Sequence, residues 1–104
     1  MEQGTTAIHT REQPDRVILQ LHGTIDIFVA ADLHARAKPL AAMGKDVHVS
    51  CALTDRLDTS AVQILLALQT ELHIQGNRLV MTEVPPSVEK WIAYGGLANI
   101  LLSH

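Results

Sequence analysis

The segment Leu57-Asp58-Thr59-Ser60-Ala61-Val62-Gln63-Ile64-Leu65-Leu66, residues 57–66, decides how this chain folds. An acidic residue and two small hydroxyl residues stand directly before a strongly apolar run. Such residues favour helix starts, where their oxygens accept hydrogen bonds from unpaired backbone N–H groups. A helix start also carries partial positive charge and therefore tolerates a phosphate or another anion. The segment predicts a helix whose first residues are either a plain cap or a modification site.

This helix is predicted over Thr59–Ile74, and Gly76 supplies its C-terminal stop. One helical face gathers an apolar stripe that we expect to pack on the core: Ala61, Leu65, Leu68 and Leu72, with Ile64 beside them. The opposite side carries polar residues and two apolar ones: Gln63, Thr70, His73, Val62 and Leu66. Val62 and Leu66 are adjacent on the helix surface. They are either part of a partner surface or ordinary apolar residues that loops cover.

The same helical wheel separates the two hydroxyl residues. Thr59 projects to the side of Val62 and Leu66, whereas Ser60 projects toward the flank of the helix. Thr59 is therefore the better candidate for a residue that an enzyme modifies and that a partner protein recognises. The alternative is that Asp58 or Thr59 only caps the helix. The partner-binding residues predicted from this segment are Asp58, Thr59, Val62, Gln63 and Leu66.

Working outward, turn signals and apolar alternation predict the strands. Their expected ranges are a weak strand at Thr5–Thr10, a clear one at Arg16–His22 that ends at Gly23, then Asp46–Ala52 and Asn77–Thr82. Thr24–Phe28 is expected to be a connection.

Two further helices are expected. Val29–Met43 has helical composition, and Pro39 should kink that helix or end it early. Pro85-Pro86-Ser87 should open a helix through Ala93. Gly95-Gly96 ends it, and Leu97–Leu102 is a last apolar segment. Strands that alternate with helices predict an α/β fold with a mixed sheet, as one domain over residues 1–104.

Composition excludes several classes of protein. A net charge of −3 and a pI of about 6.0 argue against nucleic-acid binding, which needs a basic patch. Cys51 is the only cysteine, so no intrachain disulfide forms and a reducing compartment fits. The start of the chain lacks signal-peptide features, and no apolar run approaches the roughly 18 residues of a membrane span. We expect a cytoplasmic protein without direct membrane insertion.

No residue set points to catalysis or to a metal. Cys51 lies in a short apolar strand and is expected to be a buried small hydrophobe rather than a nucleophile. The six histidines lack close metal-ligand spacing. Asp26, Asp55 and Asp58 could gather near one end of the sheet, but solvated loop ends explain them better than acid/base chemistry. We therefore expect no enzyme activity, no cofactor and no metal.

The ordered combination of these segments resembles the STAS family, the sulfate-transporter and anti-sigma-factor-antagonist domain. The residues that carry the resemblance are Asp58-Thr59-Ser60-Ala61, the Leu-rich helix that follows, Gly76, the strand around Leu79–Met81, Pro86-Ser87-Val88, Gly96-Leu97 and the region from Gly23 to Leu33. The resemblance implies a four- or five-stranded mixed sheet with helices packed mainly on one face.

In the anti-sigma-factor antagonists of this family, a partner kinase phosphorylates the Ser or Thr directly after the Asp. That position is Thr59 here, with Ser60 as the lesser candidate. The common bacterial pattern is Asp-Ser-Ser-Gly, from which Thr59 and Ala61 depart. The resemblance implies a non-enzymatic regulator in a partner-switching signalling pathway, whose partner is an anti-sigma factor or a serine/threonine protein kinase.

A second function remains open. Relatives with Asp-Thr at this position include the cytoplasmic accessory STAS subunit of phospholipid-transport ABC systems, which docks on the ABC ATPase. The pair Asp58-Thr59 fits that pattern as well.

Overall fold

Four strands and two long helices follow one another in a computed structural model that describes residues 7–89. Their bounds are β1 Ile8–Glu12, β2 Arg16–Ile25, α1 Ile27–Ala42, β3 Asp46–Leu57, α2 Thr59–Ile74 and β4 Leu79–Thr82, followed by a helical turn at residues 86–89. The predicted order of elements is confirmed, and α2 has the predicted bounds.

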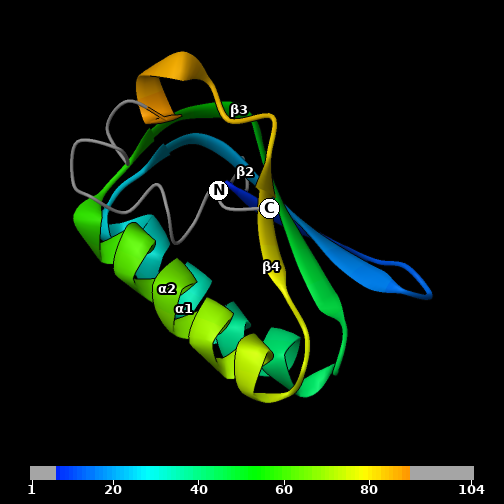
Figure 1. The fold of residues 1–104 in the computed structure, drawn as a ribbon. Coiled ribbons are helices and arrows are strands. Elements are labelled where there is room, and N and C mark those ends of the chain that lie inside the picture. The colour runs from blue at the N-terminus through cyan, green and yellow to red at the C-terminus, as the bar shows by residue number, and fades with distance from the viewer. Residues whose placement is uncertain (1–6, 90–104) are drawn as a thin grey trace, which may run out of the picture.

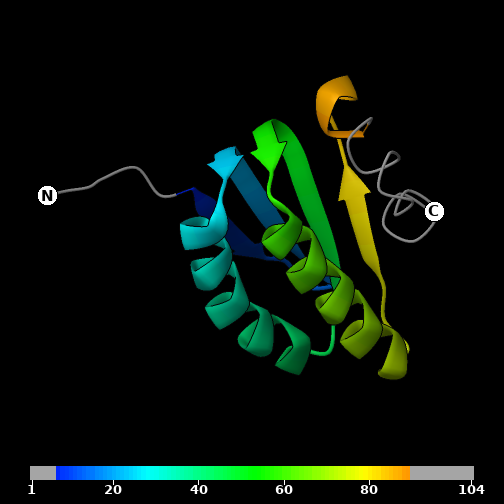
Figure 2. The same ribbon diagram turned by 90° about the vertical axis from the view of Figure 1, so that its left-hand side faces the viewer.

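The sheet is mixed and has the order β1-β2-β3-β4 among the described residues. A hairpin makes β1 and β2 antiparallel, whereas β2, β3 and β4 run parallel to one another. The crossovers between the parallel strands are α1 and α2, which lie side by side on one face of the sheet (Figures 1 and 2). The predicted fold class, a mixed sheet with helices on one face, is confirmed.

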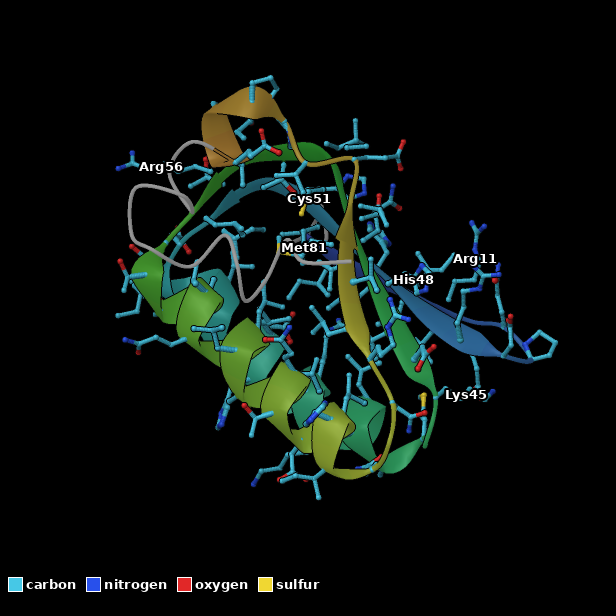
Figure 3. All side chains as sticks on the ribbon, in the orientation of Figure 1. Arg11, Lys45, His48, Cys51, Arg56 and Met81 are labelled. Carbon is cyan, nitrogen blue, oxygen red and sulfur yellow. The ribbon has the colours of Figure 1, made fainter. Side chains whose placement is uncertain are left out.

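The core lies between this sheet and the two helices. Alternate residues of the strands are buried there, including Leu19 in β2, Val49 in β3 and Met81 in β4. The residues between them face the other side of the sheet, as expected for a period of two. Figure 3 shows this division: Cys51 and Met81 point toward the helices, while His48 lies on the opposite side.

Gly23 does not end β2, contrary to the sequence prediction. The strand continues to Ile25, and its register against β3 shifts next to Gly23, which has φ +69°. Glycine adopts this left-handed backbone without strain, so it allows a bulge inside a continuous strand. β3 likewise runs beyond Ala52 to Leu57, because it remains paired with the longer β2.

Helix α1 begins two residues before the predicted start at Val29, and it does not end early at Pro39. It starts at Ile27, directly after its N-cap Asp26, and continues through Pro39 to Ala42. The early end predicted at Pro39 is therefore wrong. Proline lacks an N–H and leaves only the carbonyl of Ala35 without its helical donor, on an exposed part of the helix.

Some predictions fall outside the described residues. These are the first part of the strand at Thr5–Thr10, the helix beyond residue 89, the Gly95-Gly96 stop and the apolar segment Leu97–Leu102.

Candidate functional site

The starts of α1 and α2 lie at the same edge of the sheet. β2 and β3 are parallel, and their last residues, Ile25 and Leu57, pair directly. The N–H of Asp58 donates to the carbonyl of Ile25 over 2.9 Å, which ties the start of α2 to the end of β2. The first turns of both helices are therefore neighbours, as Figure 2 shows.

The two hydroxyl residues of α2 differ in their surroundings. Thr59 is exposed, and its hydroxyl forms no hydrogen bond with any residue in the described range 7–89. Ser60 is half-buried, and its Oγ donates to Oδ2 of Asp58 over 2.7 Å. The Thr59 hydroxyl is free and accessible, whereas the Ser60 hydroxyl is engaged.

Asp58 occupies the N-cap position of α2, but its side chain makes no capping hydrogen bond to the helix backbone. The hydrogen bond from Ser60 holds the pKa of its carboxyl below the usual value, and the nearby N–H groups of Ser60 and Thr59 and the charge of Arg56 lower it further. In contrast, Asp26 caps α1 by accepting from the N–H groups of Phe28 and Val29, each over 3.0 Å. The first turn of α2 thus keeps backbone donors that no capping side chain occupies.

Val62 does not lie on the surface, so its predicted exposure beside Thr59 is wrong. Its side chain is 0% exposed and belongs to the core, and Leu66 is half-buried against the same core. The reason is tertiary: α2 contacts β4 as well as α1 and β3, so the buried arc of the helix is wider than one apolar stripe. Gln63 is exposed, as predicted.

Sequence reasoning missed Ile27 and Phe28, which are exposed at the start of α1, next to the start of α2. Ile27 is 62% exposed and Phe28 is 82% exposed, at the first turn of α1. The signal was present, because two large apolar residues directly follow an Asp that can cap a helix. We call Ile27, Phe28, Asp58, Thr59 and Gln63 the Thr59 surface.

The thiol of Cys51 is unsuited to catalysis. It is buried, and desolvation raises its pKa to about 11, against a small opposing effect of a hydrogen bond with Thr54. A thiol must lose its proton to act as a nucleophile or metal ligand.

The described part of the chain contains no cluster of three or more His, Cys, Asp or Glu side chains that could hold a metal ion. Of the three acidic residues considered above, Asp26 is engaged in the cap of α1 and Asp58 in the hydrogen bond with Ser60. Neither helix in residues 7–89 is long and apolar enough to cross a membrane.

Comparison with protein families identifies the chain. A family model described as "Mlab, STAS domain" matches residues 8–103, so the chain belongs to the STAS domain family. The resemblance seen in the sequence is confirmed. No curated protein sequence matches the chain significantly.

Several solved structures share the fold. The anti-sigma factor antagonist SpoIIAA in its unphosphorylated form is 19% identical, with a TM-score of 0.81 over 92% of this chain and 86% of that one. An anti-sigma factor antagonist from Mycobacterium paratuberculosis is 18% identical, with a TM-score of 0.74 over 93% of this chain and 85% of that one. The Bacillus cell fate determinant SpoIIAA in its phosphorylated form is 18% identical, with a TM-score of 0.74 over 92% and 89%. At these identities the likeness concerns the fold.

Proposed function

We propose that this STAS domain is a non-enzymatic, cytoplasmic regulator that binds a protein partner through the Thr59 surface, in the manner of an anti-sigma-factor antagonist. The partner would be an anti-sigma factor or a serine/threonine protein kinase. The observation that carries this proposal is the exposed Thr59 hydroxyl, which has no hydrogen bond within residues 7–89, at a helix start next to the helix start that exposes Ile27 and Phe28.

The apolar part of this surface supports binding. Phe28 is the only phenylalanine of the chain and has little of its ring buried. Exposed aromatic residues beside polar ones are typical anchors of protein interfaces. Ile27 and Phe28 take the place that Val62 and Leu66 were expected to fill.

Phosphorylation of Thr59 would switch this binding. A phosphate adds a charge of about −1.5 to −2, and the N–H groups at the start of α2 would donate hydrogen bonds to it without unfolding of the helix. Next to the carboxylate of Asp58, it would make the surface strongly negative and repel an acidic or apolar partner. One of the structurally similar proteins has been solved in a phosphorylated form. Unmodified protein would bind, and modified protein would release.

The test measures the affinity for each anti-sigma factor or kinase of the native cell by calorimetry. Thr59→Glu should weaken binding by about tenfold or more, whereas Thr59→Val should bind like the wild type. Thr70→Glu is the matched control, since it places the same charge on an exposed part of α2 away from the Thr59 surface. The switch is refuted if Thr59→Glu binds as tightly as Thr70→Glu. Mass spectrometry of the native protein would show whether Thr59 carries phosphate.

A second function is the accessory subunit of a phospholipid-transport ABC ATPase. The Asp58-Thr59 pair favours it, as does the family model's description as "Mlab, STAS domain". In this case the Thr59 surface would dock on the ATPase constitutively. Thr59 would then be unmodified in the cell, and the ABC ATPase rather than a kinase would bind the purified protein with Phe28-dependent affinity.

A further inference from the structure

The sheet face opposite α1 and α2 carries a set of polar side chains unrelated to the Thr59 surface. No helix of the described residues covers this face, which Figures 1 and 2 show on the far side of the sheet from both helices. The residues on this face are mostly polar and come from all four strands: His9 and Arg11 of β1, Ile18, Gln20 and His22 of β2, His48 and Ser50 of β3, and Val80 and Thr82 of β4.

A depression of about 160 Å³ lies on this face and is lined by His9, Arg11, Ile18, Gln20 and Ser50. The strand register explains the grouping. His9 pairs with Gln20, and Gln20 pairs with Ser50, so these three form one row across the sheet. Arg11 pairs with Ile18 in the next row. The imidazole, guanidinium, amide and hydroxyl groups all offer hydrogen-bond donors.

Arg11 is the arginine that lines this depression. Three other basic residues form ion pairs with exposed carboxylates: Arg16 with Asp15 at 3.4 Å, Arg36 with Asp32 at 3.3 Å and Lys45 with Glu12 at 2.6 Å. Arg11 forms no ion pair within residues 7–89. Its guanidinium lies on the exposed side of β1, directed away from the core (Figure 3).

His22 lies next to the depression but does not line it. Its ring lies against that of His9, with centroids 4.8 Å apart and a tilt of 59°. Its Nε2 is buried, yet it has no hydrogen-bond partner in the described part of the chain.

We propose that this depression binds a small tetrahedral oxyanion of the sulfate or phosphate type from solution. Arg11 would supply the charge, and His9, Gln20 and Ser50 would supply further donors. The volume of the depression, about 160 Å³, accommodates an anion of this size. This site lies on the other face of the sheet from the helices, so it is independent of the proposed partner binding.

Glu83 competes with the anion. Its Oε2 accepts a hydrogen bond from Oγ of Ser50 over 3.4 Å, so an internal carboxylate already uses one donor of the depression. An incoming anion must replace that contact and tolerate the nearby charge. Removing the charge of Glu83 should therefore strengthen anion binding, while removing that of Arg11 should weaken it.

The experiment is an NMR titration of the full chain with sodium sulfate near pH 6, with chloride keeping the ionic strength constant. We expect saturable shifts of the amides of β1 and β2 and of the Arg11 and His9 side chains. Arg11→Gln should weaken the affinity about five- to tenfold, since it removes a charge-assisted hydrogen bond. Glu83→Gln should strengthen it about twofold, as expected for an exposed charge.

Arg56→Gln is the matched control, because Arg56 is also an exposed arginine but lies outside the depression (Figure 3). Equal affinities of the Arg11→Gln and Arg56→Gln variants would overturn the proposal. Shifts that do not saturate would overturn it too and would indicate an adventitious ion only. Shifts confined to Thr59 and Ser60 would assign the anion to the start of α2 instead.

Discussion

At the scale of single residues, the surroundings of two adjacent hydroxyls distinguish them. The Ser60 hydroxyl donates a hydrogen bond to the Asp58 carboxylate, which holds the Ser60 side chain against the helix start. Thr59 has no such contact in the described structure and remains exposed. The helical wheel favoured Thr59 because of the direction in which its side chain projects. The structure adds that the Ser60 hydroxyl forms a hydrogen bond and that the Thr59 hydroxyl is exposed. Whether Thr59 is phosphorylated stays a prediction.

The buried thiol of Cys51 gives a pH dependence of stability. The thiol has its ordinary pKa of 9.0 in the unfolded chain. In the folded chain its pKa is raised to about 11, because burial disfavours the thiolate. Between these pH values only the unfolded state releases the proton, so the free energy of unfolding falls as the pH rises. The loss attributable to Cys51 should reach about 2–3 kcal/mol.

Urea unfolding of the wild type and of Cys51→Ala, at intervals from pH 8 to pH 11, measures this loss. Cys51→Ala should start less stable, because it leaves a small cavity, but its stability should fall less steeply with pH. Parallel curves for the two proteins would contradict the assignment to Cys51.

At the scale of elements, the two helices begin with an aspartate that acts differently in each. Asp26 accepts two backbone hydrogen bonds at the start of α1, whereas Asp58 accepts none at the start of α2. Asp26→Ala should therefore lower the free energy of unfolding by about 1 kcal/mol. Asp58→Ala should lower it by less, because no capping hydrogen bond is lost at the start of α2.

Thermal and urea unfolding of both variants decide this comparison. Equal losses would mean that Asp58 caps α2 in solution after all. In that event the start of α2 would lack free donors for a phosphate, which would also weaken the proposed switch at Thr59.

Element boundaries show what local patterns do and do not predict. α2 has its predicted bounds because both its ends carry local signals: Asp58 before it and Gly76, with φ +82°, after it. β2 and β3 are longer than predicted, since each is extended by pairing with the other. Gly23 has the sequence signature of a turn, yet it lies in a bulge that only the partner strand reveals.

At the scale of the whole molecule, the fold separates a helix-covered face from an open sheet face. The parallel pairing of β2 and β3 brings the starts of α1 and α2 to one edge, where the Thr59 surface forms. The sheet face that no described helix covers carries Arg11, His9, His22 and His48. The two proposed sites are thus on different parts of the molecule and can be tested separately.

Because Val62 is buried and Phe28 is exposed, we expect Val62 to contribute to stability and Phe28 to partner binding. Val62→Ala removes a fully buried side chain and should lower the free energy of unfolding by about 2 kcal/mol. Phe28→Ala removes a mostly exposed ring and should change it by less than about 0.5 kcal/mol, while it weakens partner binding. Urea unfolding and calorimetry with the partner separate the two effects. A Phe28→Ala variant as unstable as Val62→Ala would show that Phe28 is a core residue.

The sequence by itself determined the order of elements, the helix from Thr59 to Ile74, the mixed sheet and the STAS family, because caps, stops and apolar periods are local signals. Only the tertiary structure decided which side chains reach solvent. Val62 is buried because α2 also contacts β4, and Phe28 is exposed because the cap at Asp26 starts α1 where nothing in the described structure covers it. Exposure depends on neighbours far away in the chain, and no helical wheel contains them.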